Sequence, residues 1–286
     1  MRRAVIIPLL ADASTDRKAV GFQHLENVFR GVGTTIYIGV NGSKVYEVMA
    51  NAYSTNKVQY VNCGVEPNPY IARNLCLSIA SMENFDLFTL LDADVIPDVH
   101  YLRNLKNYET SAVPQLIKGW VSTVMPTTRT KHFDTLRPLN FEMYGKHTFD
   151  WCVGANMSFN RKALDILGPM SEERAGGDGI YGRDFERAGY KVTAAPDVRV
   201  LKVVSRMRLQ DILRKQLQWA LDTPADMIPP VEDAKVFLSE LIKDAPDLTE
   251  GDSQYPSFVD WCFKLQMTLG RIAAHYDTPT QESDHA

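Results

Sequence analysis

The sequence predicts an α/β protein with a mixed central sheet that carries helices on both faces, followed by a C-terminal helical extension. Segments with strand-like and helix-like patterns of apolar residues alternate through the N-terminal third, which is typical of a parallel sheet with covering helices. Short polar turns also follow two of the strand-like segments directly, and ligands of such sheets bind beyond the carboxyl ends of the strands. A chain of 286 residues is long enough to bury the core of this fold.

The elements of the N-terminal third are predicted from their residue types. β-Branched and aromatic residues mark the strands, and apolar residues at helical spacing mark the helices. The expected strands are 4–10, 34–40, 58–61 and 87–91, and the expected helices are 45–53 and 69–82, with another helical pattern from Phe22 to Phe29.

The rest of the chain is irregular at first and then ordered again. The stretch from 98 to about 151 is rich in Thr, Pro and basic residues, which predicts extended segments and loops over the site. The elements expected beyond it are a short helix after Ala163, a helix through Gly189, a strand from Val192, helices at 211–221, 231–242 and 256–276, and a disordered tail at 277–286.

Composition argues against several classes of function. The formal net charge is −4, so no overall basic field draws the protein to nucleic acid or to a membrane surface. No window approaches the roughly 20 apolar residues of a membrane span, and we expect a cytoplasmic protein. The four cysteines lie far apart without a CxxC pair, which argues against zinc and favours buried thiols in a reducing compartment.

Two aspartates one residue apart, Asp92 and Asp94, follow the apolar segment at 87–91. Like charges this close raise each other's pKa, and a divalent cation removes that penalty. Mg²⁺ or Mn²⁺ prefers a few carboxylates together with phosphate oxygens and water, so the pair predicts a metal that bridges a diphosphate. The alternative, from these residues alone, is a solvated turn or a helix cap.

The segment LFTLLDADVIP, with apolar residues on both sides of the acidic pair, resembles the DxD motif of GT-A fold glycosyltransferases, in particular the inverting family 2. Other segments match that family in the same order, along roughly residues 4 to 220. They are Pro8 after the first strand, the turn Asn41-Gly42-Ser43, the helical Ala72-Arg73-Asn74, Trp151 to Phe159 with its G-x-N pattern, Gly177-Asp178, Gly189-Tyr190 and Pro196.

The resemblance implies a GT-A domain over 1–221, with 1–98 binding a nucleotide sugar and 99–221 binding the acceptor, and a helical extension over 222–276. It implies transfer of a single sugar from a nucleoside-diphosphate sugar to an acceptor hydroxyl, with inversion and with help from Mn²⁺ or Mg²⁺. Asp178 would be the general base, and Asp92 and Asp94 would hold the metal. The donor side would comprise Pro8, Asn41, Arg73, Asp92, Ala93, Asp94 and Lys202, and the acceptor side Trp151, Asn156 and Gly177.

Several positions depart from the family pattern, among them four that bear on the predicted site. Val40 stands where the family has an acidic residue that reads uracil, so the donor nucleotide stays open, and Gly177 replaces a glutamate that contacts the acceptor. Asn68 replaces a glycine, and asparagine also accepts a left-handed backbone. Lys202 replaces a histidine of the metal site. Because a charged ammonium donates only, either Asp94, the diphosphate and water hold the metal alone, or Lys202 itself neutralises the diphosphate. A surface lysine on an edge strand is the further alternative.

Three residues of the matched segments also have an interpretation that needs no ligand. Asp178 could cap the N-terminus of its helix, and Arg73 could be an exposed helix residue. Asn74 is expected to stitch a loop by hydrogen bonds rather than to touch a substrate.

Alternatives remain for function and partners. A nucleotidyltransferase can share the sheet and the acidic site, although the first strand lacks the glycine-rich loop expected of one, and a non-catalytic nucleotide-sugar-binding protein would explain the departures. Basic residues at 127–137 and 199–215 leave a nucleic-acid acceptor, such as a hydroxylated base in DNA, as a further alternative. The apolar faces of the helix at 256–276 predict packing on the domain or a dimer.

Overall fold

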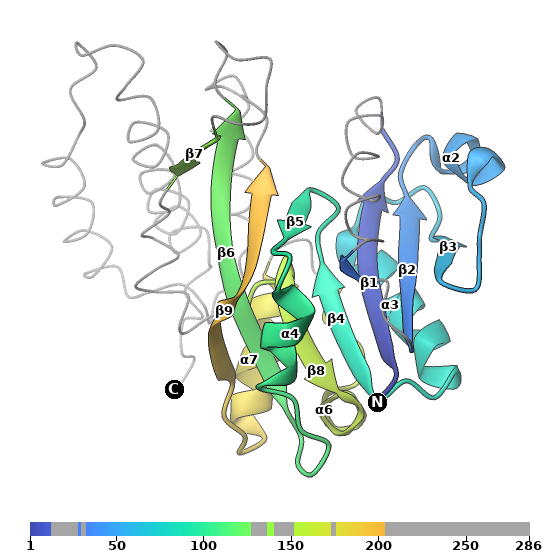
Figure 1. The fold of residues 1–286 in the computed structure, drawn as a ribbon. Coiled ribbons are helices and arrows are strands. Elements are labelled where there is room, and N and C mark those ends of the chain that lie inside the picture. The colour runs from blue at the N-terminus through green and yellow to red at the C-terminus, as the bar shows by residue number, and fades with distance from the viewer. Residues whose placement is uncertain (13–27, 30–32, 127–135, 140–151, 173–175, 204–286) are drawn as a thin grey trace, which may run out of the picture. The chain divides into compact units, whose positions relative to one another are not determined.

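The computed structural model describes residues 1–12, 28–29, 33–126, 136–139, 152–172 and 176–203 (Figure 1). All of them lie in Met1–Ser205, the first of two compact units into which the chain divides. Trp151 and the helices predicted at 211–221, 231–242 and 256–276 lie outside the described residues, so the domain boundaries and the dimer stay predictions.

One mixed sheet of nine strands forms the centre of the described part of the chain (Figure 1). The strands are β1 (Arg3–Leu10), β2 (Thr34–Asn41), β3 (Val58–Asn62), β4 (Leu87–Leu91), β5 (Val95–Pro97), β6 (Leu116–Pro126), β7 (Leu136–Leu139), β8 (Asn156–Asn160) and β9 (Thr193–Val203). Their order is β3-β2-β1-β4-β8-β6-β9-β5, with β7 paired to β6.

The strand pairing is parallel on the N-terminal side and mixed beyond it. β1 lies parallel between β2 and β4, and β3 is parallel to β2. β8 is antiparallel to β4 and β6, whereas β9 is parallel to β6 and antiparallel to β5. The predicted mixed α/β sheet is therefore confirmed, and its arrangement is consistent with a Rossmann-like GT-A fold.

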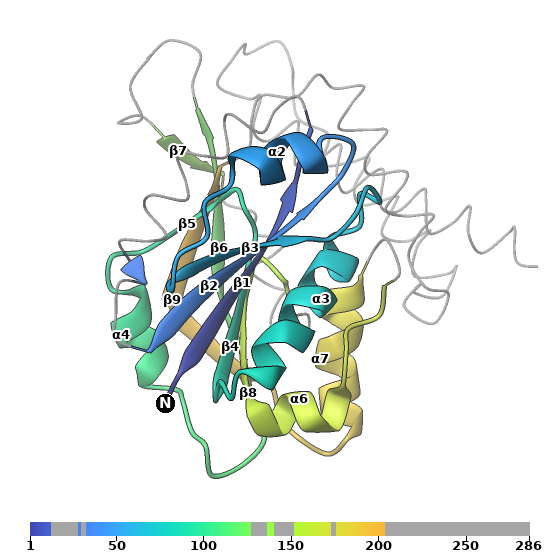
Figure 2. The same cartoon turned by 90° about the vertical axis from the view of Figure 1, so that its right-hand side faces the viewer.

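Helices cover both faces of this sheet (Figure 2). Figure 2 shows α3, α6 and α7 along one face and α4 on the other. Within the described ranges, no helix is both long enough and apolar enough to cross a membrane. The helices are α2 (Val45–Asn51), α3 (Pro69–Met82), α4 (Tyr101–Lys106), α6 (Arg161–Leu167) and α7 (Gly177–Arg187).

The core has two parts, one on each side of the sheet, and β1 contributes to both. Val5, Ile7 and Leu9 join the cluster on one face, whereas Ala4 and Ile6 join the cluster that includes α3 and α7 residues on the other. A strand buried on both faces needs a continuous apolar run rather than an alternating one, which is why this segment is apolar almost throughout.

The start of α3 corrects one expectation about the backbone. Asn68 has φ −109° and is the N-cap of α3, and its side chain accepts a hydrogen bond from the Tyr70 backbone N–H at 2.9 Å. Pro69 follows in the first turn, where a missing N–H costs nothing. The left-handed backbone predicted at Asn68 is therefore wrong, because the residue is selected for capping instead.

The stretch predicted as extended segments and loops after residue 98 contains more order than expected. It holds α4 and the eleven-residue strand β6, which pairs with β7, β8 and β9. Two part-buried polar contacts tie α4 and the residues just after it to β9. Asn104 Nδ2 donates to the carbonyl of Asp197, and Tyr108 Oη donates to its carboxylate at 2.5 Å.

Candidate active site

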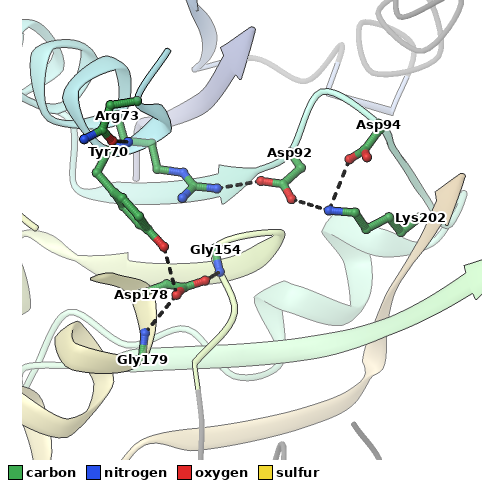
Figure 3. A network of polar contacts seen from close by, with 9 residues as sticks. Tyr70, Arg73, Asp92, Asp94, Gly154, Asp178, Gly179 and Lys202 are labelled. Atoms are coloured by element: carbon green, nitrogen blue, oxygen red, sulfur yellow. Dashed lines mark hydrogen bonds and ion pairs between the residues drawn. The ribbon is translucent and has the colours of Figure 1, made fainter. Parts of the chain in front are cut away.

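The candidate site lies beyond the strand ends, where the strand order changes direction. The chain adds β2 and β3 on one side of β1 and then β4 on the other, and ligands of open α/β sheets bind outside the strand ends at such a point. Asp92 and Asp94 directly follow β4, and Lys202 reaches them from β9 (Figure 3). Asp178 comes from the first turn of α7.

Asp92 lies between two positive charges. Arg73 Nη2 donates to Oδ1 of Asp92 at 2.5 Å, and Lys202 Nζ donates to Oδ2 at 2.7 Å. The Arg73 side chain is only 4% exposed. Because a guanidinium stays charged in proteins, this position needs an anion beside it, and Asp92 supplies that anion.

Lys202 is shared by both aspartates of the motif. Its Nζ also lies 3.4 Å from Oδ1 of Asp94. Burial raises the pKa of Asp94, the Lys202 ammonium opposes that rise, and the charge of Asp92 adds to it. The Asp94 side chain is 41% exposed, so water screens part of these effects.

Lys202 is not a lysine on an edge strand, because β9 lies between β6 and β5. That alternative is therefore wrong. The ammonium acting on a diphosphate, and a metal held by Asp94, the diphosphate and water alone, both stay predictions.

Arg73 is a buried residue rather than an exposed helix residue. Its guanidinium carbon lies 5.3 Å from the ring centroid of Tyr70, the distance of a cation–π contact. On its other side is Gly154, where a Cβ atom would stand 2.7 Å from the guanidinium. Only glycine leaves that space open. The glycine of the G-x-N segment therefore makes room for Arg73.

Asp178 accepts hydrogen bonds from three groups of the described residues. Tyr70 Oη donates to Oδ1 at 3.1 Å, the Gly179 N–H donates to the same oxygen at 3.0 Å, and the Gly154 N–H donates to Oδ2 at 2.6 Å. Burial and the Asp178 charge raise the pKa of Tyr70, so its hydroxyl stays protonated and available as a donor. The N-cap of α7 is Gly176, with φ 77°, so the alternative in which Asp178 caps the helix is wrong.

These contacts form one continuous network (Figure 3). Asp178 is joined through Tyr70 to Arg73, Arg73 is paired with Asp92, and Lys202 links Asp92 to Asp94. The network brings together a carboxylate that can accept a proton and a cluster with two fixed cations, of which Lys202 is the more exposed and Arg73 is buried.

Asn41 holds the backbone ahead of α3 in place. Its Nδ2 donates to the carbonyls of Glu66 at 2.9 Å and Asn68 at 2.8 Å, and the residue is 2% exposed. Both amide protons are thus used within the protein. The predicted contact between Asn41 and the sugar donor stays a prediction. Because both protons of Nδ2 are already donated within the protein, Nδ2 would support such a contact only by holding the backbone in place.

Asn156 is engaged in the same way. Its Nδ2 donates to the carbonyls of Trp120 at 3.0 Å and Val198 at 2.9 Å, and its Oδ1 accepts from Tyr101 Oη at 2.8 Å. The residue is 1% exposed, so an acceptor contact made by it would act through these neighbours. Its side chain occupies the space above Gly119, where a Cβ would lie 2.2 Å from Nδ2.

Asn74 stitches a loop, as predicted. Its Nδ2 donates to the Met170 carbonyl at 2.8 Å and to Glu172 Oε1 at 3.0 Å, and its Oδ1 accepts from the Met170 N–H at 2.9 Å. These bonds tie α3 to the segment that precedes α7.

The other predicted site residues have packing roles that their sequence did not reveal. A Cβ on Gly177 would lie 2.7 Å from the Ser171 carbonyl and 3.0 Å from the Tyr70 ring, so no larger residue fits there on this backbone. Val40 is fully buried in the core. Pro8 lies two residues beyond Ile6, the last residue of β1 that pairs with β4, so its missing N–H costs no bond to β4.

The residues around Asp92 and Asp94 do not fit a divalent cation well. Among the described residues, no group of three His, Cys, Asp or Glu side chains could hold one. An ammonium already bridges the two carboxylates, and Arg73 faces one of them at 2.5 Å. Mg²⁺ and Mn²⁺ need oxygen or nitrogen lone pairs, whereas ammonium and guanidinium groups offer only donors.

Sequence reasoning missed Tyr70 and the specific role of Gly154. Tyr70 lies one helical turn before Arg73, and side chains three apart on a helix are neighbours. That spacing was the available signal. The pairing of Tyr70 with Asp178, 108 residues away, had no local signal.

Comparisons with known proteins support the fold. No protein-family model matches the chain, and no curated protein matches it. The mannosyltransferase PcManGT from Pyrobaculum calidifontis, solved in complex with GDP-Man and Mn²⁺, is similar at a TM-score of 0.52 and 14% identity, over 97% of this chain and 75% of that one. TarS from S. aureus is similar at a TM-score of 0.50 and 11% identity, over 89% of this chain, which spans 45% of the TarS chain.

Proposed function

We propose that the protein is a glycosyltransferase that moves one sugar from a nucleoside-diphosphate sugar to an acceptor hydroxyl. The observation that carries the proposal is the network that joins the Asp92–Asp94 cluster and its two cations to a separate carboxylate, Asp178. This network lies at the strand ends of a sheet whose fold is similar to that of a mannosyltransferase. The family 2 resemblance of the sequence points to the same reaction.

On the donor side, negative charge develops on the diphosphate as the bond to the sugar breaks. Fixed cations that face this charge stabilise the transition state without reorganising. Lys202, whose side chain is 32% exposed and bonds to Asp92, would be the cation that faces a phosphate oxygen. Arg73 is buried and would act by holding Asp92 in place.

On the acceptor side, Asp178 would take the proton of the attacking hydroxyl. A carboxylate offers about four lone-pair positions, and three of them are engaged by Tyr70, Gly154 and Gly179. The hydroxyl oxygen forms a bond to the anomeric carbon as the diphosphate leaves, and its proton passes to Asp178. Attack from the face opposite the diphosphate would invert the anomeric centre.

The departures from the family pattern do not favour a non-catalytic protein. Val40 is a core residue, Gly177 is required by the Ser171 carbonyl, and Lys202 contacts both aspartates. Each departure thus has a packing or charge reason. No observation favours a nucleotidyltransferase over a glycosyltransferase. A nucleic-acid acceptor stays an alternative.

Binding of nucleoside diphosphates and nucleotide sugars, measured by thermal shift, tests the proposal. A ligand present at 100 times its dissociation constant stabilises the native state by about 2.7 kcal/mol, which is roughly 5–10 °C for a domain of this size. We expect one nucleotide to give such a shift. No shift with any nucleotide, with or without Mn²⁺, would overturn the transferase proposal.

The role of Asp178 is tested by release of nucleoside diphosphate from the donor that binds. Asp178→Asn should keep the donor-induced shift and lose at least roughly 100-fold in turnover. Asp184→Asn is the matched control on the same helix, because the Asp184 side chain is 47% exposed and pairs only loosely, at 3.5 Å, with Arg187. Equal turnover in the two variants would remove Asp178 from the mechanism.

A further inference from the structure

The ammonium of Lys202 lies between the two carboxylates that a divalent cation would occupy in a DxD site. Its Nζ is 2.7 Å from Oδ2 of Asp92 and 3.4 Å from Oδ1 of Asp94 (Figure 3). An ammonium carries three donors and no acceptor, so it can face both carboxylates but offers no lone pair to a metal ion.

The strand register holds Lys202 at this position. Lys202 pairs with Val95 of β5, the residue that directly follows Asp94, and with Thr123 of β6 on the other side. The backbone on both sides of Lys202 is therefore fixed by the sheet. The side chain cannot be moved away from the two aspartates without breaking the β5–β9 pairing or changing its rotamer.

Both carboxylates of the site already face side-chain cations. Asp92 and Asp94 carry two negative charges, and Lys202 and Arg73 carry two positive charges within 4 Å of Asp92 or Asp94. The two side-chain cations together equal the charge of one Mn²⁺ ion. Carboxylate oxygens that a divalent cation would need as ligands already face these donors.

We propose that Lys202 takes the place of the divalent cation in this site, so that the protein binds the diphosphate of its donor without a metal. The diphosphate part of this inference rests on the proposed function. The exclusion of metal from the aspartate pair does not, because it can be measured with the metal alone.

The first measurement is a titration of the full chain with Mn²⁺ in the absence of nucleotide. Electron paramagnetic resonance detects the Mn²⁺ that stays free. Wild type should show no binding below about 1 mM Mn²⁺, because the aspartates are already neutralised. Lys202→Met frees the aspartates from the ammonium, and Lys202→His also adds an imidazole ligand. Both variants should bind Mn²⁺ at least about tenfold more tightly than wild type, and Lys202→His should bind it more tightly than Lys202→Met.

Lys162→Met is the matched control, because Lys162 is an exposed lysine whose Nζ bonds to the Ala112 carbonyl, away from the aspartates. It should behave as wild type. Micromolar Mn²⁺ binding by wild type, or identical binding by wild type and both Lys202 variants, overturns the inference.

The second measurement is the affinity for nucleoside diphosphates in EDTA and in Mn²⁺, by calorimetry. Wild type should bind its nucleotide equally in both, within about twofold, whereas Lys202→Met should lose about tenfold or more in EDTA. A tenfold loss by wild type in EDTA overturns the inference. If no nucleoside diphosphate binds under either condition, the proposed function fails, and the Mn²⁺ measurement still decides whether Lys202 excludes metal.

Discussion

Asp92→Asn should destabilise the fold strongly, because it leaves a buried guanidinium without its anion. Arg73 is 3% exposed and cannot lose its proton, so it has no way to avoid the loss of its partner. Breaking a buried pair by removing one partner costs about 3–5 kcal/mol. Lys202 adds little to this cost, since its side chain is 32% exposed and keeps Asp94. We therefore expect a loss of about 3 kcal/mol, or roughly 6–12 °C in Tm.

Urea unfolding followed by circular dichroism measures this loss as a lower midpoint with an unchanged slope. Asp184→Asn is again the control, because an exposed pair contributes less than about 1 kcal/mol. The double variant Arg73→Met/Asp92→Asn removes both charges and should recover most of the stability. If Asp92→Asn is as stable as Asp184→Asn, or if the double variant is less stable than Asp92→Asn, the reasoning about the buried charge is wrong.

Three further predictions use the same network. Tyr70→Phe removes a donor to Asp178 and should lower kcat roughly tenfold at unchanged KM, whereas Tyr181→Phe, which removes another buried hydroxyl, should leave both constants as they are. The pKa of Asp94 is raised in the folded state, so the folded protein keeps this proton to a higher pH than the unfolded chain, and stability falls as pH rises above 3.8. Asp94→Asn should therefore resist urea better than wild type at pH 7 and lose that advantage below pH 3.8. Gly177→Ala should cost roughly 1–3 kcal/mol in urea unfolding, because its Cβ would lie 2.7 Å from a backbone carbonyl, and an unchanged midpoint would contradict the packing described there.

The parts of the fold that could be predicted are those with a strong local signal. The helix at 69–82 was predicted with the bounds that α3 has, because its apolar residues recur at helical spacing. The capping role of Asn68 was not predicted. The strand at 87–91 was equally clear, since five buried apolar or β-branched residues end abruptly at an aspartate. Short or partly polar elements, such as the six-residue α4, gave no such pattern.

The parts of the site that could not be predicted depend on contacts between distant segments. Lys202 and Asp92 are 110 residues apart, and their contact requires both the β5–β9 pairing and its register. A shift of one residue would turn Lys202 to the other face of the sheet. Sequence alone therefore identified Lys202 as unusual, but it could not distinguish a surface lysine from one placed between two carboxylates.

The position of Arg73 indicates that α3 sets the geometry of both halves of the site. One turn of this helix presents Tyr70 to Asp178 and Arg73 to Asp92. Because both side chains are buried and Gly154 leaves no spare room beside the guanidinium, neither can move independently of the helix. A displacement of α3 would therefore misplace the base and the aspartate cluster together. Arg73 then acts on a donor through Asp92 rather than by touching it, which explains why an arginine matching a donor-side segment is almost completely shielded from solvent.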